Sequence, residues 1–153
     1  MLIINANIIS MCGNDYENGY IRIEEGVITD IGDMSKAPDA NDVYDAQGGF
    51  AVPGLIDAHC HIGLFGDGVG EESEDCNESA DPLTPHLRTI DGINMLDRCF
   101  EEARRAGVTT VAVAPGSANV LGGQISILKT SGVCVEDAII KEPAALKVAL
   151  GEN

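Results

Sequence analysis

The sequence predicts an α/β fold in which a small all-β unit precedes a strand–helix–strand unit. Two observations predict it. Residues 1–52 carry short alternating runs separated by turn residues, whereas residues 53–153 contain an apolar strand, a helix and a β-branched strand in that order. A strand–helix–strand connection joins parallel strands of one sheet. We therefore place a domain boundary between Val52 and Pro53.

The first 52 residues are predicted to form short strands joined by tight turns. Within residues 2–8, the apolar Leu2, Ile4, Ala6 and Ile8 alternate with Asn5 and Asn7, the period-two pattern of a half-buried strand. Glu25-Gly26 separates residues 20–24 from residues 27–31, which is the spacing of a tight β-hairpin. Residue types that carry chemistry do not cluster here, so this unit is expected to be structural. Further short strands are expected at residues 43–46 and 50–52.

A compact apolar run with two histidines opens the second part of the chain. Residues 55–61 are predicted to form a buried strand, followed by a Gly-rich, acidic loop over residues 66–85. A helix is expected over residues 95–106, with Asn94 as its N-cap, because Asn caps helix N-termini well. The apolar residues at helical spacing predict its buried face, which would contain Leu96, Cys99, Phe100 and Ala103.

A β-branched and almost uncharged run follows the predicted helix. Residues 108–114 have the composition of a parallel strand that is covered on both faces. A flexible Gly-rich loop and a short apolar piece at residues 125–128 come next. A third strand is expected at residues 146–150.

Charge and cysteine content exclude several classes of partner. The formal net charge is −16, so phosphate backbones and anionic lipids would repel the chain, and we expect neither nucleic-acid nor membrane partners. Five cysteines at irregular spacing, without a Cys-x-x-Cys pair, favour reduced thiols in a cytosolic protein over a disulfide framework. The opening residues lack the basic start of a signal peptide. A cytoplasmic location is therefore expected.

The most informative residues are His59 and His61. On a strand, residues two apart face the same way, so both imidazoles project together while Cys60 points to the opposite side. Two imidazoles on one face can bind one divalent metal. Asp57 lies on that face one step deeper, where a carboxylate could orient a ligand.

A chance His-x-His pair is the alternative to a metal site. This pair, however, ends a predicted strand that opens a strand–helix–strand unit, and it uses two of the three histidines in the chain. That context favours the metal interpretation.

The strand Pro53-Gly54-Leu55-Ile56-Asp57-Ala58-His59-Cys60-His61 resembles the metal-binding strand of the amidohydrolase superfamily residue for residue. The resemblance extends over essentially the whole chain, through residues 26–32, 45–48 and 105–111. Residues 115–120 and 122–124 are similar to the imidazolonepropionase-related members.

This resemblance implies a fold, a cofactor and a reaction. The fold would be a small N-terminal β-sandwich (residues 1–52) followed by the first βα units of an incomplete TIM (β/α)₈ barrel (residues 53–153). The cofactor would be one or two divalent ions, zinc above all, held partly by His59 and His61. The reaction would be hydrolysis of a non-peptide C–N bond of a cyclic amide or amidine by a metal-activated hydroxide.

The resemblance also implies that parts of the enzyme lie outside this sequence. A TIM barrel alone takes about 250 residues, whereas 101 residues follow Val52. The superfamily takes two more histidine ligands and a proton-transfer aspartate from later strands. We therefore expect the chain to be a fragment of such an enzyme, inactive in isolation.

Four weaker candidates complete the predicted site. Glu152 follows the expected third strand and could bridge two metals, although an exposed terminal glutamate is an equal alternative. Lys147 could serve as the carbamate that the superfamily uses, but a solvated lysine is the default. His86 is expected to be structural, with substrate contact as a minority interpretation. The acidic run from Asp67 to Asp81 is expected to be a solvated loop.

Two other functions remain open, and the chain is expected to assemble with a partner. The same ligands would serve a deaminase of a nitrogen heterocycle, and a catalytically inactive remnant could act only in assembly. A barrel opened after about three strands leaves unpaired strand edges and apolar surfaces, which recruit other strands. We therefore expect a small-molecule substrate and either a homo-oligomer or a missing C-terminal half as partner. The contact surfaces are expected around residues 108–114 and 146–150.

Overall fold

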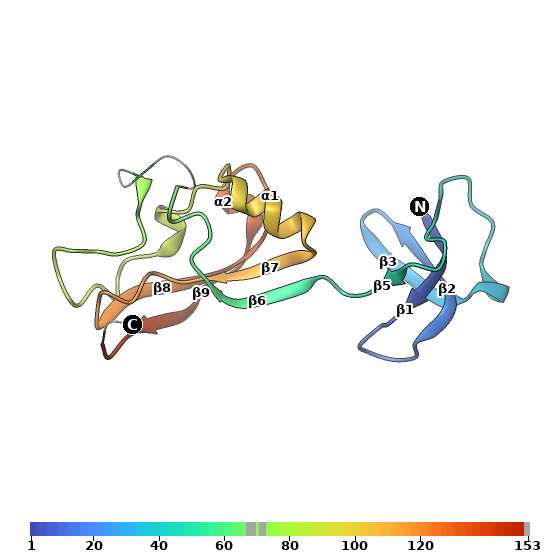
Figure 1. Cartoon of the computed structure of the whole chain (residues 1–153), viewed down its shortest axis with the longest axis horizontal. Helices are drawn as coiled ribbons and strands as arrows, with labels where there is room; N and C mark the ends of the chain where they lie inside the picture. The colour runs from blue at the N-terminus through green and yellow to red at the C-terminus, as the bar shows by residue number, and fades with distance from the viewer. Residues whose placement is uncertain (67–69, 71–72, 152–153) are drawn as a thin grey trace. The chain divides into compact units, whose positions relative to one another are not determined.

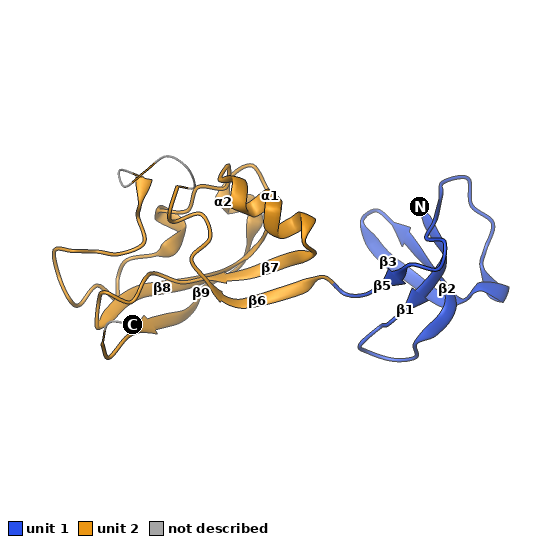
Figure 2. Cartoon of the chain, in the orientation of Figure 1, with its two compact units in different colours: residues 1–53 blue, residues 54–153 orange. Residues whose placement is uncertain are grey.

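The computed structural model describes residues 1–66, 70 and 73–151. It divides into two compact units, Met1–Pro53 and Gly54–Asn153 (Figure 2). The division falls within one residue of the predicted boundary. The assignment of these units to a sandwich domain and to part of a barrel stays a prediction.

The first unit is a five-stranded sheet. Its order is β3-β2-β1-β4, and β5 also pairs with β1. The pairs β1–β2 and β2–β3 are antiparallel, whereas β4 and β5 run parallel to β1. The strands are β1 (Leu2–Ile8), β2 (Tyr16–Glu24), β3 (Val27–Asp33), β4 (Val43–Asp45) and β5 (Phe50–Ala51), with a short 3₁₀ turn η1 (Met34–Lys36) after β3.

The predicted hairpin at Glu25-Gly26 is confirmed. Both residues have positive φ, 49° and 78°, as the tight turn between two antiparallel strands requires. The unit has a small core around Ala6, Ile8 and Ile21. All five strands belong to one hydrogen-bonded sheet, so a second, facing sheet of the predicted sandwich is not seen among the described residues.

The second unit is a four-stranded sheet in the order β6-β7-β8-β9, with α1 packed against β7 (Figure 1). The pair β6–β7 is parallel, and the pairs β7–β8 and β8–β9 are antiparallel. Its elements are β6 (Leu55–Cys60), η3 (Thr89–Asp91), α1 (Arg98–Arg105), β7 (Val108–Val113), β8 (Leu121–Lys129), α2 (Val135–Ala138) and β9 (Ile139–Val148).

The structure confirms one strand–helix–strand unit, β6–α1–β7, and corrects what was predicted after it. The apolar piece at residues 125–128 lies inside β8, which returns antiparallel to β7. The third strand expected at residues 146–150 is the end of β9, which ends at Val148 and pairs antiparallel with β8. Among the described residues, parallel βα units therefore do not continue beyond β7, and an incomplete TIM barrel is not confirmed.

Burial in the sheet also differs from the prediction for one strand. The side chains of Val111 and Val113 in β7 are buried, as expected, and pack with Phe100, Leu64 and Leu128. Residues 55–59 of β6, in contrast, are exposed. The physical reason is position, because β6 lies at an edge of the sheet and pairs with β7 alone among the described strands.

The helix is shorter than predicted. It begins after Asp97, which occupies the N-cap position expected for Asn94. The Asn94 side chain instead accepts a hydrogen bond from the Leu96 amide (3.1 Å), and Leu96 is 78% exposed rather than buried. Phe100 supplies the main apolar anchor, since only 1% of its surface is exposed. None of the helices in the described part of the chain is long and apolar enough to cross a membrane.

Candidate metal centre

His59 and His61 lie together at the carboxyl end of β6. Their ring centroids are 5.1 Å apart and the rings are nearly perpendicular. The register between β6 and β7 shifts between Asp57 and Cys60, so β6 holds one extra residue where the histidines begin. Such irregularities re-aim side chains, and they are common next to active sites. The arrangement places the exposed imidazole of His59 beside the half-buried imidazole of His61 on one rim at the end of β6.

One ring nitrogen of His61 is held by the backbone. Nδ1 lies 2.8 Å from the carbonyl oxygen of Ala114, the residue that follows β7. A carbonyl oxygen can only accept, so Nδ1 carries the proton and donates it. A metal-binding histidine usually donates its other ring N–H in this way. The Nε2 lone pair of His61 is thereby left free to bind a metal.

Nε2 of His59 faces a lysine from the far edge of the sheet. Nζ of Lys147 lies 3.3 Å from Nε2 of His59, and because an ammonium can only donate, it donates to that nitrogen. Lys147 pairs in register with Gly123 of β8. A Cβ atom added at the neighbouring Gly122 would lie 3.2 Å from Cγ of Lys147. Glycine at position 122 therefore gives the lysine stem room to lie close against β8.

Asp57 contacts the main chain of the histidine pair. Its Oδ1 accepts a hydrogen bond from the backbone amide of His59 at 3.1 Å. The carboxylate thus fixes the backbone at the start of the His-x-His segment. This contact is with the main chain and not with an imidazole ring, so the predicted role of Asp57 in orienting a ligand stays a prediction.

The remaining candidates divide by position. Glu152 lies outside the described residues, as do Asp67, Glu71 and Glu72 of the acidic run. His86 is exposed, in a segment that backbone hydrogen bonds at Thr84 and Leu87 tie to β8. Within the residues that the structure describes, no group of three or more His, Cys, Asp or Glu side chains is placed to hold a metal ion. The described part of the chain therefore presents the two histidines and Lys147, and not a full set of such ligands.

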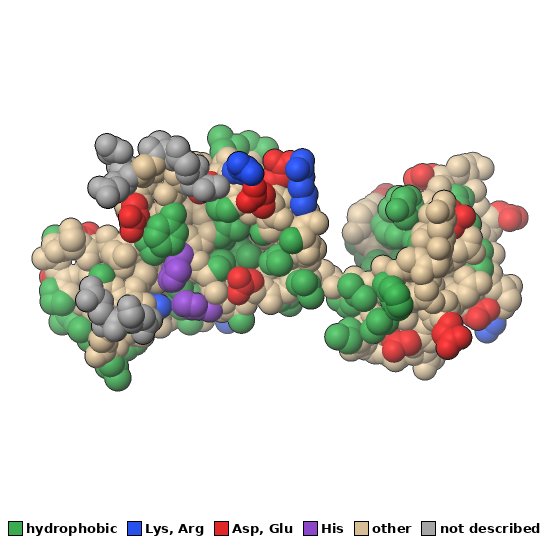
Figure 3. Space-filling view, viewed as in Figure 1, with side chains coloured by type: hydrophobic (Ala, Val, Ile, Leu, Met, Phe, Trp, Pro, Cys, Tyr) green, Lys and Arg blue, Asp and Glu red, His purple; other side chains and the backbone are tan. Residues whose placement is uncertain are grey.

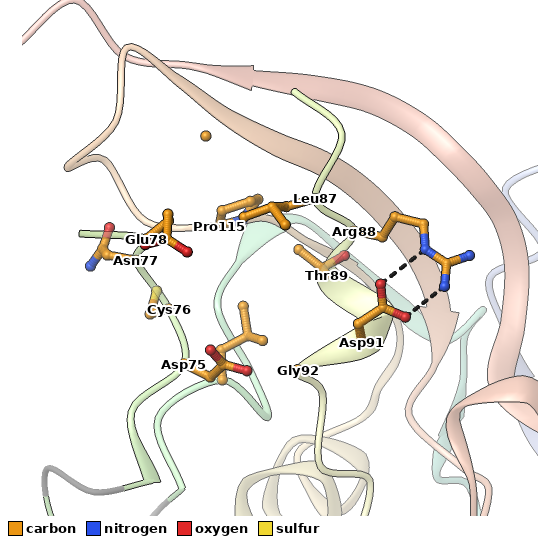
Figure 4. A pocket seen from close by; sticks show the side chains of 12 residues that line it. Asp75, Cys76, Asn77, Glu78, Leu87, Arg88, Thr89, Asp91, Gly92 and Pro115 are labelled. Atoms are coloured by element: carbon orange, nitrogen blue, oxygen red, sulfur yellow. Dashed lines mark hydrogen bonds and ion pairs between the residues drawn. The ribbon is translucent and has the colours of Figure 1, made fainter. Parts of the chain in front are cut away.

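A cavity of about 210 Å³ lies in the same unit without the histidines among its lining residues (Figure 4). Arg88 forms a two-pronged ion pair with Asp91 in its wall, at 3.0 Å and 2.6 Å, and this hydrogen bonding raises the pKa of the guanidinium. Glu142 of β9 lies 3.4 Å from the same arginine. Burial raises the pKa of the Cys76 thiol, also in the wall. The arginine is thus already neutralised by carboxylates of its own chain.

Sequence reasoning gave Lys147 little weight and did not single out the Arg88–Asp91 pair. The three-residue spacing of Arg88 and Asp91 was a usable signal, since residues three apart meet on a helical turn, and both border or belong to η3. The meeting of Lys147 and His59 had no local signal, because 88 residues separate them.

Known proteins resemble this chain in both sequence and structure. It is 34% identical over 114 residues to an amidohydrolase, TasK, of Hapsidospora irregularis, covering 72% of this chain and 12% of that protein. It is 40% identical over 62 residues to an adenine deaminase of Listeria monocytogenes, covering 40% of this chain and 10% of that protein. No protein-family model matches the chain.

A solved structure agrees over nearly the full length. The crystal structure of an amidohydrolase from Thermotoga maritima MSB8 superposes with a TM-score of 0.90 and 42% identity, covering 99% of this chain and 39% of that chain. The parallel β6–β7 pair with its terminal histidines and these likenesses together define the class. The chain belongs to the amidohydrolase superfamily and corresponds to an N-terminal portion of it. It spans only about a tenth of the length of the relatives matched by sequence.

Proposed function

We propose that this chain supplies the first metal ligands of an enzyme that hydrolyses a non-peptide C–N bond in a cyclic amide or amidine. The observation that carries the proposal is the pair of imidazole rings 5.1 Å apart at the end of β6. The relatives named as an amidohydrolase and an adenine deaminase support hydrolytic chemistry at a C–N bond. The more specific likeness to imidazolonepropionase-related enzymes is part of the proposal.

The protein groups have distinct tasks in this proposal. His61 presents Nε2 because the Ala114 carbonyl holds its Nδ1 proton. His59 would present Nε2 on the neighbouring rim position once Lys147, whose ammonium donates to that nitrogen, has lost its proton, and Asp57 fixes its backbone amide. One or two divalent ions, zinc above all, would supply Lewis-acid activation of water and of the scissile group. Two imidazoles are half of the tetrahedral set that zinc prefers.

The sequence suggested two candidates for a third metal ligand, Glu152 and Lys147. Of these, Lys147 is the better placed. It lies 3.3 Å from His59, whereas Glu152 is outside the described residues. Addition of the uncharged Nζ to carbon dioxide forms an N–C bond, releases one proton to water and leaves a carbamate. That carbamate would turn a cation beside His59 into an anionic oxygen ligand. The proposal therefore includes Lys147 as a carbamate ligand in place of Glu152.

A deaminase of a nitrogen heterocycle is the alternative reaction. The matched adenine deaminase supports it, because 62 residues of this chain align with that protein. Both reactions would use the same two histidines, so the rest of the enzyme decides between them. A remnant that acts only in assembly is the third possibility, and metal binding distinguishes it from the two enzymes.

Zinc titration by calorimetry tests the site directly. The wild-type chain is expected to bind zinc measurably but weakly, because two protein ligands leave the ion half-coordinated by water. His59→Ala and His61→Ala should each weaken binding at least tenfold. His86→Ala is the matched control and should bind as the wild type does. Tight, stoichiometric binding retained in the double variant His59→Ala/His61→Ala would refute the site.

A further inference from the structure

Strand β8 holds one extra residue opposite the lysine that reaches the histidines. Leu121 of β8 lies opposite Val148 of β9. Gly123 lies opposite Lys147, the residue just before Val148, so Gly122 is the additional residue of a β-bulge. A bulge leaves its extra residue out of the ladder and re-aims the side chains near it. The geometry at Gly122 therefore decides where the Lys147 side chain points.

The stem of Lys147 lies directly against this bulge. A Cβ atom added at Gly122 would lie 3.2 Å from Cγ and 3.5 Å from Cβ of the lysine. At the far end of the stem, Nζ lies 3.3 Å from Nε2 of His59. Figure 3 shows a basic side chain beside histidine side chains on the surface of the second unit. A shift of the Gly122 backbone would change the surface on which the stem rests, and so would move Nζ away from His59.

Thr84 holds the bulge from a segment outside both strands. Its hydroxyl donates to the carbonyl oxygen of Gly122 at 2.8 Å and also lies 3.1 Å from the carbonyl oxygen of Leu121. Its backbone amide donates to the Leu121 carbonyl at 2.8 Å, and the Leu121 amide donates to the Pro82 carbonyl at 3.3 Å. Only 3% of the surface of Thr84 is exposed, and a buried hydrogen bond is electrostatically stronger than one in water. The hydroxyl therefore fixes the carbonyl of the residue that the ladder leaves out.

We propose that Thr84 is a positioning residue of the candidate metal centre, whose hydroxyl holds the Gly122 bulge in the geometry that aims Lys147 at Nε2 of His59. Thr84 acts through the bulge, because its hydroxyl bonds are to backbone carbonyls of β8. Without the hydroxyl, the Gly122 carbonyl loses this partner, the bulge relaxes and the lysine amine leaves His59. The inference rests on the proposed function, in which Lys147 is a ligand.

Nitrogen NMR of the metal-free chain tests the contact itself. The ¹⁵N chemical shift of Nε2 of His59 depends on whether that nitrogen accepts a hydrogen bond, and Lys147→Met gives the value without one. Spectra are recorded at about pH 8, where an ordinary imidazole is neutral. Thr84→Val is expected to move the shift to the Lys147→Met value. Thr84→Ser keeps a hydroxyl and should keep the wild-type value.

Thr130→Val is the matched control. Thr130 is 1% exposed, and its hydroxyl likewise donates to a backbone carbonyl, that of Val108, at 2.9 Å. This variant loses an equivalent buried bond in the same unit, so it should be similarly destabilised and still keep the wild-type shift. Circular dichroism shows which variants are folded, and Thr84→Ala replaces Thr84→Val if the latter does not fold.

The bicarbonate dependence of zinc binding gives a second measurement. Added bicarbonate should tighten zinc binding several-fold in the wild-type chain and in Thr84→Ser, but not in Thr84→Val. The inference is overturned if folded Thr84→Val keeps the wild-type shift, if Thr130→Val moves it as far, or if Lys147→Met leaves it unchanged. A wild-type chain that binds no zinc would refute the proposed function instead, while the NMR comparison would still decide the role of Thr84.

Discussion

Two main-chain contacts organise the His-x-His segment at the scale of single residues. The Ala114 carbonyl fixes one nitrogen of His61, and Asp57 fixes the backbone amide of His59. The pairing of His59 with His61 was predictable, because a strand repeats every two residues. The approach of Lys147 was not, because it depends on the register between β8 and β9 and on the bare backbone of Gly122.

Carbamate formation on Lys147 gives a prediction at this scale. Added bicarbonate is expected to tighten zinc binding several-fold in the wild-type chain, because a carbamate adds an anionic ligand beside His59. Lys147→Met keeps the stem but loses the amine, so bicarbonate should have no effect on it. Calorimetric zinc titration with and without bicarbonate measures the difference. Equal bicarbonate dependence in both proteins would remove Lys147 from the ligand set.

Tyr20 and Asp30 give a pH-dependent prediction in the first unit. The Tyr20 hydroxyl donates to Asp30 at 2.6 Å, and this hydrogen bond, with burial, raises the pKa of the tyrosine. A raised pKa means that the contribution to stability is complete below about pH 10, the ordinary tyrosine value, and is lost as the pH rises through the higher folded-state value.

Thermal unfolding at several pH values checks this sign. Tyr20→Phe should be less stable than the wild type at pH 8, and the gap should narrow as the pH rises above about 10. Asp30→Asn is a useful companion, because it keeps an acceptor but removes the charge. A stability difference between Tyr20→Phe and the wild type that is the same at every pH would show that ionisation of the Tyr20 hydroxyl does not affect stability.

At the scale of elements, the sequence predicted which segments form most of the strands and the helix. It predicted how these elements connect only in part. The β6–α1–β7 unit follows from the helical spacing and the β-branched run. Strand β8 was mistaken for a loop because Gly122 and Gly123 are poor strand formers. Pro143 disguised β9 in the same way, since proline is tolerated mainly in edge strands, and β9 is one. Local composition therefore failed where tertiary pairing decided the structure.

Gly123 of β8 gives a prediction for that element. Its φ is +150°, and an added Cβ would lie 2.9 Å from the backbone carbonyl oxygen of Leu87. The amide of Gln124 donates to the same carbonyl at 2.8 Å, so that oxygen cannot move without loss of the bond. Gly123→Ala should therefore destabilise the second unit by about 1–3 kcal/mol.

Chemical denaturation of matched variants measures this cost. Gly151→Ala is the control, because its Cβ would meet no atom within 4 Å and its φ is not positive. It should change the free energy of unfolding by less than about 0.5 kcal/mol. Equal stability of the two variants would mean that the segment around Leu87 can shift without cost.

At the scale of the whole molecule, the open sheet matters more than any one side chain. The sequence predicted open edges, but it located them around residues 108–114 and 146–150. The structure buries the first of these in β7, because β8 pairs with it, and leaves the edge at β6 instead. Leu146 and Leu150 are exposed, at 43% and 94%, and a contact surface at this second location stays a prediction.

The 153-residue chain alone is expected to show no hydrolase or deaminase turnover. The described residues offer two imidazoles and a lysine, and the proton-transfer aspartate is expected, from the family resemblance, on a later strand. Acid–base assistance alone is worth about 10²–10⁴-fold in rate. Assays with a cyclic amide such as hydantoin, and with adenine, check this in the presence of zinc. Turnover that His61→Ala abolishes would show that the chain is a complete catalyst.

The bond between His61 and Ala114 joins two neighbouring strands as well as fixing a ring. Slippage of β6 past β7 by one residue would carry the imidazole to the other face and break that bond. The tautomer of His61 is therefore a spectroscopic reporter of strand alignment. In a ¹⁵N-labelled sample, loss of the Nδ1-protonated form would signal misregistered folding even where secondary structure is intact. In this molecule the Nδ1-protonated form of His61 therefore reports two things at once: the correct register of β6 against β7, and an Nε2 lone pair that is free to bind a metal.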